Sequence, residues 1–310
     1  MQQGALAFFK PSLQVLMFLF FLLLGLILTG GITIFVLRLM HIQPNALNEI
    51  TGISSILQLN AIRVATIVQD VFFFLFPALL FCFLFEKKGN RGLFNPRSLP
   101  VNIFLLIIAL WVSVLPFIEF LGIWNEKIKL PGFLDELQKN LQASEAYLDG
   151  IVSQLIHTKS LSILGLNLLT VGLLTAISEE FIFRGALQSL LIRWIKMDHL
   201  AIFIGAFIFS AIHLQFYGFF PRLILGLILG YLYYWSGSIW PGVLFHFINN
   251  GVQVFMGYSS DSLKAQITND VGIENIIKSE GWISLLSLGL SIILLIIIYK
   301  QCKTKDLVSL

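Results

Sequence analysis

Residues 161–190 read LSILGLNLLTVGLLTAISEEFIFRGALQSL, a long apolar stretch that two adjacent carboxylates and an arginine interrupt. Without Glu179, Glu180 and Arg184 the stretch is typical of a membrane-spanning helix, which needs ~20 predominantly apolar residues. Ionisable side chains at membrane depth are costly and usually serve a function. The stretch therefore predicts a membrane helix that carries part of a buried polar site.

The whole chain has the composition of a polytopic membrane protein. Of its 310 residues 57% are hydrophobic and only 12% are charged, and its mean hydropathy is +0.88, outside the usual range of soluble proteins. The net charge of +3 is small and the basic residues form no stripe, which argues against nucleic acid as a partner. Cys82 and Cys302 lack the spacing of a zinc ribbon or a disulfide framework.

Apolar segments bounded by charges, Gly, Pro and turn residues predict an all-α protein with about eight transmembrane helices. The first follows Lys10 without a small-residue cleavage site, so we expect it to be a retained span. Residues 132–157 have apolar side chains at helical spacing among acids and amides, which fits an amphipathic helix on the membrane surface or a loop helix packed over the bundle. The predicted spans are 15–37, 64–85, 101–123, 161–190, 200–216, 220–236, 239–256 and 282–299.

Basic clusters at 87–97, 193–196 and 300–305 predict the cytoplasmic side, and the acidic or balanced connections 124–160 and 257–281 predict the outer side. Both termini of this multi-pass cell-membrane protein are then cytoplasmic. Arg38 and Arg63, near the outer ends of the first two spans, do not fit this orientation. We divide the chain into an N-terminal transmembrane scaffold (1–160), a catalytic core (161–256), and a last loop, helix and basic tail (257–310).

Glu180 and Arg184 are four residues apart, so on a helix they share a face and form an ion pair. Glu179 is rotated by about 100° from Glu180 and has no partner at that spacing, which makes it the candidate working carboxylate. The alternative is that both glutamates lie in water at the cytoplasmic end of the helix.

Two further polar motifs lie downstream, Phe209 with His213 and His246 with Asn250, again four residues apart. A glutamate beside an imidazole can take a proton from water, while a second imidazole and an amide N–H stabilise the resulting oxyanion. Glu179 and the two histidines are also a known type of zinc ligand set, although the chain has no HExxH motif. Ser178 and Ser210 lack the context of a serine nucleophile.

The ordered trio EExxxR, FxxxH and HxxxN resembles that of the CAAX protease and bacteriocin-processing family of intramembrane endopeptidases, also called the abortive-infection family. The resemblance implies an eight-helix protease of the glutamate type whose buried polar cavity, in the C-terminal helices, opens to the cytosol. By motif position, Glu179 with His213 would activate water and His246 with Asn250 would form the oxyanion hole. Glu180, Arg184 and Phe209 would support the site.

The resemblance further implies no metal ligand, with zinc as the alternative, and a membrane-associated peptide or protein as the substrate in the lipid bilayer. The chain looks most like the bacterial members, some of which are associated with bacteriocin immunity or peptide maturation. The competing hypothesis is a non-catalytic immunity or scaffold protein, or a proton-coupled transporter. A transporter would be expected to show an inverted repeat, and the sequence shows none.

Overall fold

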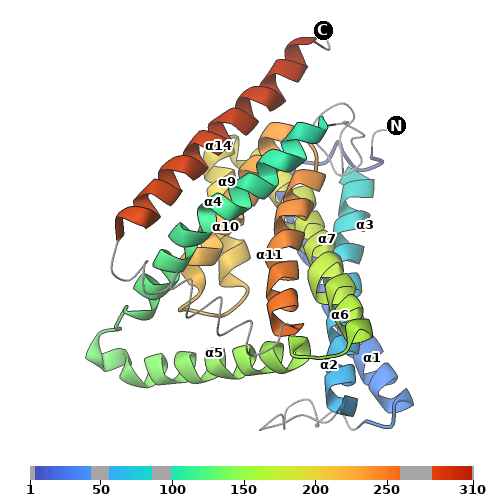
Figure 1. Ribbon diagram of the computed structural model, residues 1–310. Coiled ribbons are helices and arrows are strands. Elements are labelled where there is room, and N and C mark those ends of the chain that lie inside the picture. Colours follow the sequence, from blue (N-terminus) through green and yellow to red (C-terminus); the bar gives the residue numbers. More distant parts are fainter. Residues whose placement is uncertain (1–3, 43–55, 86–98, 259–280, 309–310) are drawn as a thin grey trace.

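The computed structural model describes residues 4–42, 56–85, 99–258 and 281–308, and within these ranges the chain is helical without any strand (Figure 1). The prediction of an all-α membrane protein is confirmed. The elements in chain order are α1 (Pro11–Leu39), α2 (Ile56–Gln69), η2 (Asp70–Leu75), α3 (Phe76–Phe85), α4 (Val101–Glu126), η3 (Gly132–Leu134), α5 (Asp135–Ile156), α6 (Leu161–Asn167), η4 (Leu168–Leu174), α7 (Thr175–Glu180), η5 (Phe181–Gln188), α8 (Ser189–Ile195), α9 (Asp198–Ala211), α10 (Phe219–Ser236), α11 (Trp240–Tyr258) and α14 (Gly281–Val308).

Five continuous helical segments in the described ranges are long and apolar enough to cross a membrane. They are Pro11–Leu39, Ile56–Phe85, Val101–Glu126, Leu161–Ile195 and Gly281–Lys303. Helices α9, α10 and α11 are shorter, with 14, 18 and 19 residues, and match the last three predicted spans of the core. The total of eight crossings stays a prediction.

Helix α9 ends at Ala211, five residues before the predicted end of its span at 216. The chain turns at Ile212 and His213, and Leu214 then has a φ of 55° in the left-handed region, which a helix cannot contain. His213 therefore lies just beyond the end of the helix, at the start of the loop to α10. The continuous helix expected through His213 was wrong.

Helix α5 lies across one end of the bundle, and both termini lie at the opposite end (Figure 1). It packs against α2, α6 and α11, so the helix predicted within 132–157 exists and covers the bundle.

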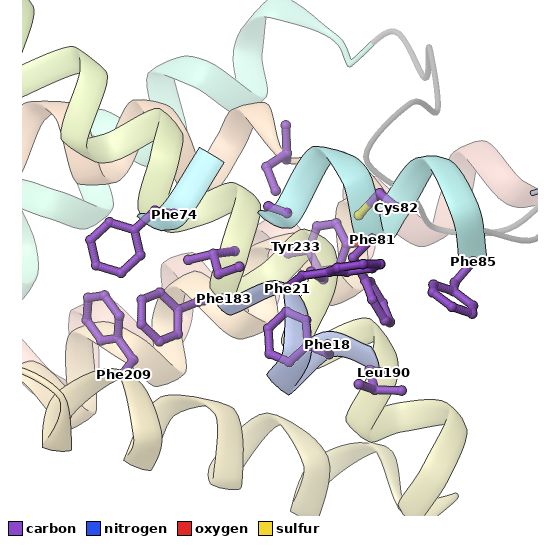
Figure 2. Packing of buried hydrophobic residues seen from close by; sticks show 14 of the residues in the cluster. Phe18, Phe21, Phe74, Phe81, Cys82, Phe85, Phe183, Leu190, Phe209 and Tyr233 are labelled. Carbon is purple, nitrogen blue, oxygen red and sulfur yellow. The ribbon is translucent and has the colours of Figure 1, made fainter. Parts of the chain in front are cut away.

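An aromatic cluster joins the N-terminal scaffold to the helices that carry the polar motifs (Figure 2). Phe18 of α1 lies 5.2 Å from Phe81 of α3, and Phe183 of η5 lies 5.1 Å, edge to face, from Phe209 of α9. Because lipid tails are as apolar as these rings, helices associate in the membrane through close packing rather than hydrophobic burial. Phe74 of η2, 6.2 Å from Phe183, connects the two halves.

Candidate active site

Glu180 is the centre of the buried polar network. Its Oε1 accepts hydrogen bonds from Arg184 Nη1 at 2.8 Å and from His246 Nδ1 at 3.0 Å, and its side chain is fully buried. This confirms the predicted ion pair and excludes the alternative that the pair lies in water. The His246 bond was not predicted. Gly242 of α11 packs against the other carboxylate oxygen of Glu180, since a Cβ at this position would lie 2.7 Å from Oε2.

Arg184 ties this centre to helix α10. Its Nη2 donates to the carbonyl of Gly226 at 3.2 Å, and one turn later Gln188 Nε2 donates to the carbonyl of Gly230 at 3.0 Å. The guanidinium also lies 4.4 Å from the centroid of the Phe209 ring, a cation–π contact. The hydrogen bonds from Arg184 to Gly226 and from Gln188 to Gly230, one helical turn apart, thus hold η5 against α10.

The Phe209 ring contacts Arg184 and both histidines. Its ring centroid is 5.2 Å from that of His213 and 6.0 Å from that of His246, in each case edge to face. The phenylalanine of the second motif therefore acts as a packing partner of the guanidinium and of both imidazoles.

The structure brings Glu179, His213, His246 and Asn250 together around one cavity of about 170 Å³. Glu179 Oε2 lies 3.7 Å from His246 Nε2, too far for a hydrogen bond but within the distance of an ion pair with the imidazolium form. Helical spacing gave Glu179 no partner, and the resemblance paired it with His213 rather than with His246. The remaining wall residues are Val152 and Ile156 of α5, Val171, Thr175, Gln253 and Val254.

Sequence reasoning missed Thr175 and Gln253, the other polar residues of this wall. Thr175 is one turn before Glu179, and Gln253 is two turns after His246, so helical spacing alone places each on the face of a predicted site residue. Both signals were present in the sequence. Nothing in the sequence indicated that α5 would supply Val152 and Ile156.

Hydrogen bonds fix the orientation of both imidazoles. His213 Nδ1 is 2.8 Å from the carbonyl of Phe209, which only accepts, so Nδ1 carries the hydrogen and the neutral ring has its lone pair on Nε2. His246 Nδ1 faces the Glu180 carboxylate in the same way and directs Nε2 toward Glu179. Among the described residues, Glu179 and His213 make no direct hydrogen bond with each other.

Asn250 is oriented by its neighbour. Asn249 Nδ2 donates to Asn250 Oδ1 at 3.4 Å, and Asn250 Nδ2 lies 3.4 Å from the carbonyl of Val171. Both contacts are long, so the amide keeps donor capacity. Asn250 lines the cavity, whereas Asn249 is not part of its wall.

Residues 161–252 match the family model described as type II CAAX prenyl endopeptidase Rce1-like. This segment is Rce1-like. No curated protein and no solved structure matches the chain. The match confirms the resemblance seen in the three motifs, all of which lie within it.

The Rce1-like segment supplies every polar group of the cavity except Gln253. Val152 and Ile156 come from α5, outside the matched residues, and close the cavity from that end of the bundle. The cavity therefore lies on the α5 side of the molecule, away from the termini (Figure 1).

The Rce1-like segment does not present a preformed metal centre. In the part of the chain that the structure describes, no group of three or more His, Cys, Asp and Glu side chains is arranged to hold a metal ion. Glu179, His213 and His246 share one cavity, and each histidine has its Nδ1 bonded to an acceptor, which leaves Nε2 as the nitrogen that a metal would use.

Proposed function

We propose that this protein is an intramembrane endopeptidase that hydrolyses a peptide bond with a water molecule activated by Glu179 and His213. The observation that supports the proposal best is the convergence of Glu179, His213, His246 and Asn250 on one cavity within an Rce1-like segment. The substrate is a membrane-associated peptide or protein, because the site is enclosed by helices and the described part of the chain has five candidate membrane spans.

The attack begins with water held between two acceptors. The Glu179 carboxylate takes one proton of the water, and His213 Nε2, left with its lone pair by the bond from Nδ1 to Phe209, accepts a hydrogen bond from the other. The oxygen then bonds to the carbonyl carbon of the substrate, and the carbonyl oxygen becomes an oxyanion.

His246 and Asn250 stabilise that oxyanion. Glu180 and Arg184 neutralise each other, so the charge of Glu179 is balanced when His246 carries a proton on Nε2 as well as on Nδ1. The Nε2–H of this imidazolium and an N–H of the Asn250 amide are then donors that face the cavity. When the C–N bond breaks, Glu179 returns its proton to the amine, and the enzyme is regenerated.

The test is Glu179→Gln, which keeps the size of the side chain and removes the base. We measure cleavage of a fluorescence-quenched peptide library in detergent micelles and expect a loss of about 10²–10⁴-fold in rate, the usual contribution of general acid–base catalysis. Glu136→Gln, which removes an exposed carboxylate of α5, is the matched control and should keep wild-type activity. Wild-type turnover by Glu179→Gln would remove Glu179 from the mechanism, whereas a wild-type protein that cleaves no peptide would favour the non-catalytic immunity, scaffold or transport hypotheses.

The same assay tests the zinc alternative. We expect purified protein to contain substoichiometric zinc and to keep its activity in strong chelator, because a carboxylate and an imidazole activate water without a Lewis acid. Loss of activity on zinc removal, with recovery on its return, would reassign Glu179 and the two histidines as ligands.

A further inference from the structure

Asp70 is a buried carboxylate outside the Rce1-like segment that the proposed mechanism does not use. It begins the π-helical turn η2 in the second span and is 2% exposed. A carboxylate at this depth is costly unless polar groups surround it. Turns of π-helix within α-helices are frequent at functional sites, and η2 packs directly against α7, the helix of Glu179.

Asp70 reaches the cavity through one hydroxyl group. Thr175 Oγ1 donates to Asp70 Oδ2 at 2.8 Å, and Thr175 is a wall residue of the cavity, one helical turn before Glu179. Asp70 also lies close enough to Glu179 and His246 to interact with both electrostatically. The contact therefore joins the N-terminal scaffold to the wall on which Glu179 lies.

The direction of the Thr175 hydrogen affects Glu179. Residues four apart on a helix are within reach of each other, so a free Thr175 hydroxyl can donate to the Glu179 carboxylate. That bond would stabilise the ionised carboxylate and make it a weaker acceptor for the proton of water. A threonine hydroxyl has a single hydrogen, and Asp70 takes it.

We propose that Asp70 is a positioning residue of this site, which holds the Thr175 hydroxyl away from Glu179 and so keeps Glu179 an effective base. The oxygen of Thr175 then faces the cavity as an acceptor only, able to receive a hydrogen bond from Glu179 once that residue carries the proton. The inference rests on the proposed peptidase function.

The carbonyl of Thr170, 3.2 Å from Thr175 Oγ1, is the competing acceptor. It is neutral, and a hydrogen bond to an ionised acceptor is roughly twice as strong as one between neutral groups. Without Asp70, the Thr175 hydrogen therefore turns to the Glu179 carboxylate rather than to Thr170.

The experiment compares Asp70→Ala, Asp70→Asn and the double variant Asp70→Ala/Thr175→Val with a quenched peptide that the wild type cleaves in micelles. We expect Asp70→Ala to lower kcat by about 10–100-fold with little change in KM. Residues that orient a functional side chain through a hydrogen bond, best measured at metal sites, contribute this much to activity. Asp70→Asn keeps an acceptor for Thr175 and should stay within a few fold of wild type. The double variant removes the misdirected hydroxyl and should recover most of kcat.

If Asp70 were needed only for folding, the double variant would lose more activity than Asp70→Ala, because the effects of the two substitutions would add. Wild-type kcat in Asp70→Ala, or a double variant slower than Asp70→Ala, overturns the inference. Asp70→Leu, which fills the space, replaces Asp70→Ala if the latter does not accumulate. Thr66→Val controls for loss of a threonine, because the Thr66 hydroxyl donates to the carbonyl of Ile62 in its own helix. Loss of cleavage in Glu179→Gln with none in the Asp70 variants rejects this inference and leaves the proposed function standing.

Discussion

Glu179 and Glu180 are neighbours in sequence with different environments. The side chain of Glu180 is fully buried against Arg184 and His246, while that of Glu179 keeps 12% of its surface exposed at the cavity. The rotation of about 100° per residue on a helix accounts for the difference. One carboxylate of the pair can therefore hold the site together while the other meets water and substrate.

We predict that Glu180→Ala and Arg184→Ala each lower thermal stability more than Glu179→Gln does. Removal of one partner leaves the other as an uncompensated buried charge, which costs about 3–5 kcal/mol. The measurement is a melting curve of each variant in the same detergent. Melting temperatures equal to that of Glu179→Gln would mean that the pair contributes nothing to stability.

The part of the site that could be predicted from sequence is the part built on helical spacing. Glu180 and Arg184 are four residues apart, and a helix brings them together wherever it lies. The bonds from His246 to Glu180 and from Thr175 to Asp70 join residues 66 and 105 positions apart. Such contacts depend on how the helices pack, and no local pattern in the chain encodes them.

At the scale of elements, glycines allow α10 and α11 to approach the polar helix closely. A Cβ at Gly230 would lie 2.8 Å from Ile202 and 2.9 Å from Gln188 Oε1, and one at Gly242 would meet Glu180. Contacts under 3 Å require a neighbour to move. Helices with small residues at their contacts can bring polar groups into bonding distance, as Gln188 and Gly230 show.

We predict that Gly242→Ala damages both folding and activity. The added methyl group would lie 2.7 Å from Glu180 Oε2, and Glu180 cannot move without straining its bonds to Arg184 and His246. Overpacking of this kind costs about 1–3 kcal/mol. We would measure melting temperature and peptide cleavage.

Gly165→Ala is the control, because a Cβ at Gly165 of α6 meets nothing within 4 Å. Alanine there should be neutral or slightly stabilising, since glycine costs roughly 0.5–1 kcal/mol in a helix interior. Equal behaviour of the two variants would show that Glu180 adapts to the added methyl group.

The sequence predicted helix boundaries well where the apolar run was long. The prediction was wrong where a turn interrupts the apolar run. The predicted spans 64–85 and 161–190 lie within continuous helices, although π-helical turns inside both were not foreseen. The span 200–216 was drawn through His213 because the residues around it are apolar, yet the chain turns there. Hydropathy reports burial in lipid and does not distinguish a helix from an apolar loop.

At the scale of the whole molecule, two expectations from the sequence conflict. The charge bias predicts cytoplasmic termini, whereas the family resemblance implies a cavity open to the cytosol. The cavity lies on the α5 side and the termini lie at the other end of the bundle, so only one of these can hold (Figure 1). Arg63, which did not fit the charge bias, is buried and bonds Asn167 and the carbonyl of Leu155, so it is no topology signal.

We predict that the α5 side faces the outside, because Lys and Arg near the ends of spans set orientation. Single cysteines at Met197 and at Lys139 of α5 report the two faces, since both positions are exposed. Met197 follows the end of α8, where Arg193 bonds Gln14 near the start of α1. In a background without Cys82 and Cys302, a membrane-impermeant thiol reagent added to intact cells should label Lys139→Cys, and Met197→Cys should require permeabilisation. Right-side-out vesicles should then cleave a peptide added from outside. The reverse labelling would place the termini outside and the cavity toward the cytosol, as the family resemblance implies, and the basic clusters would not be the topology signal.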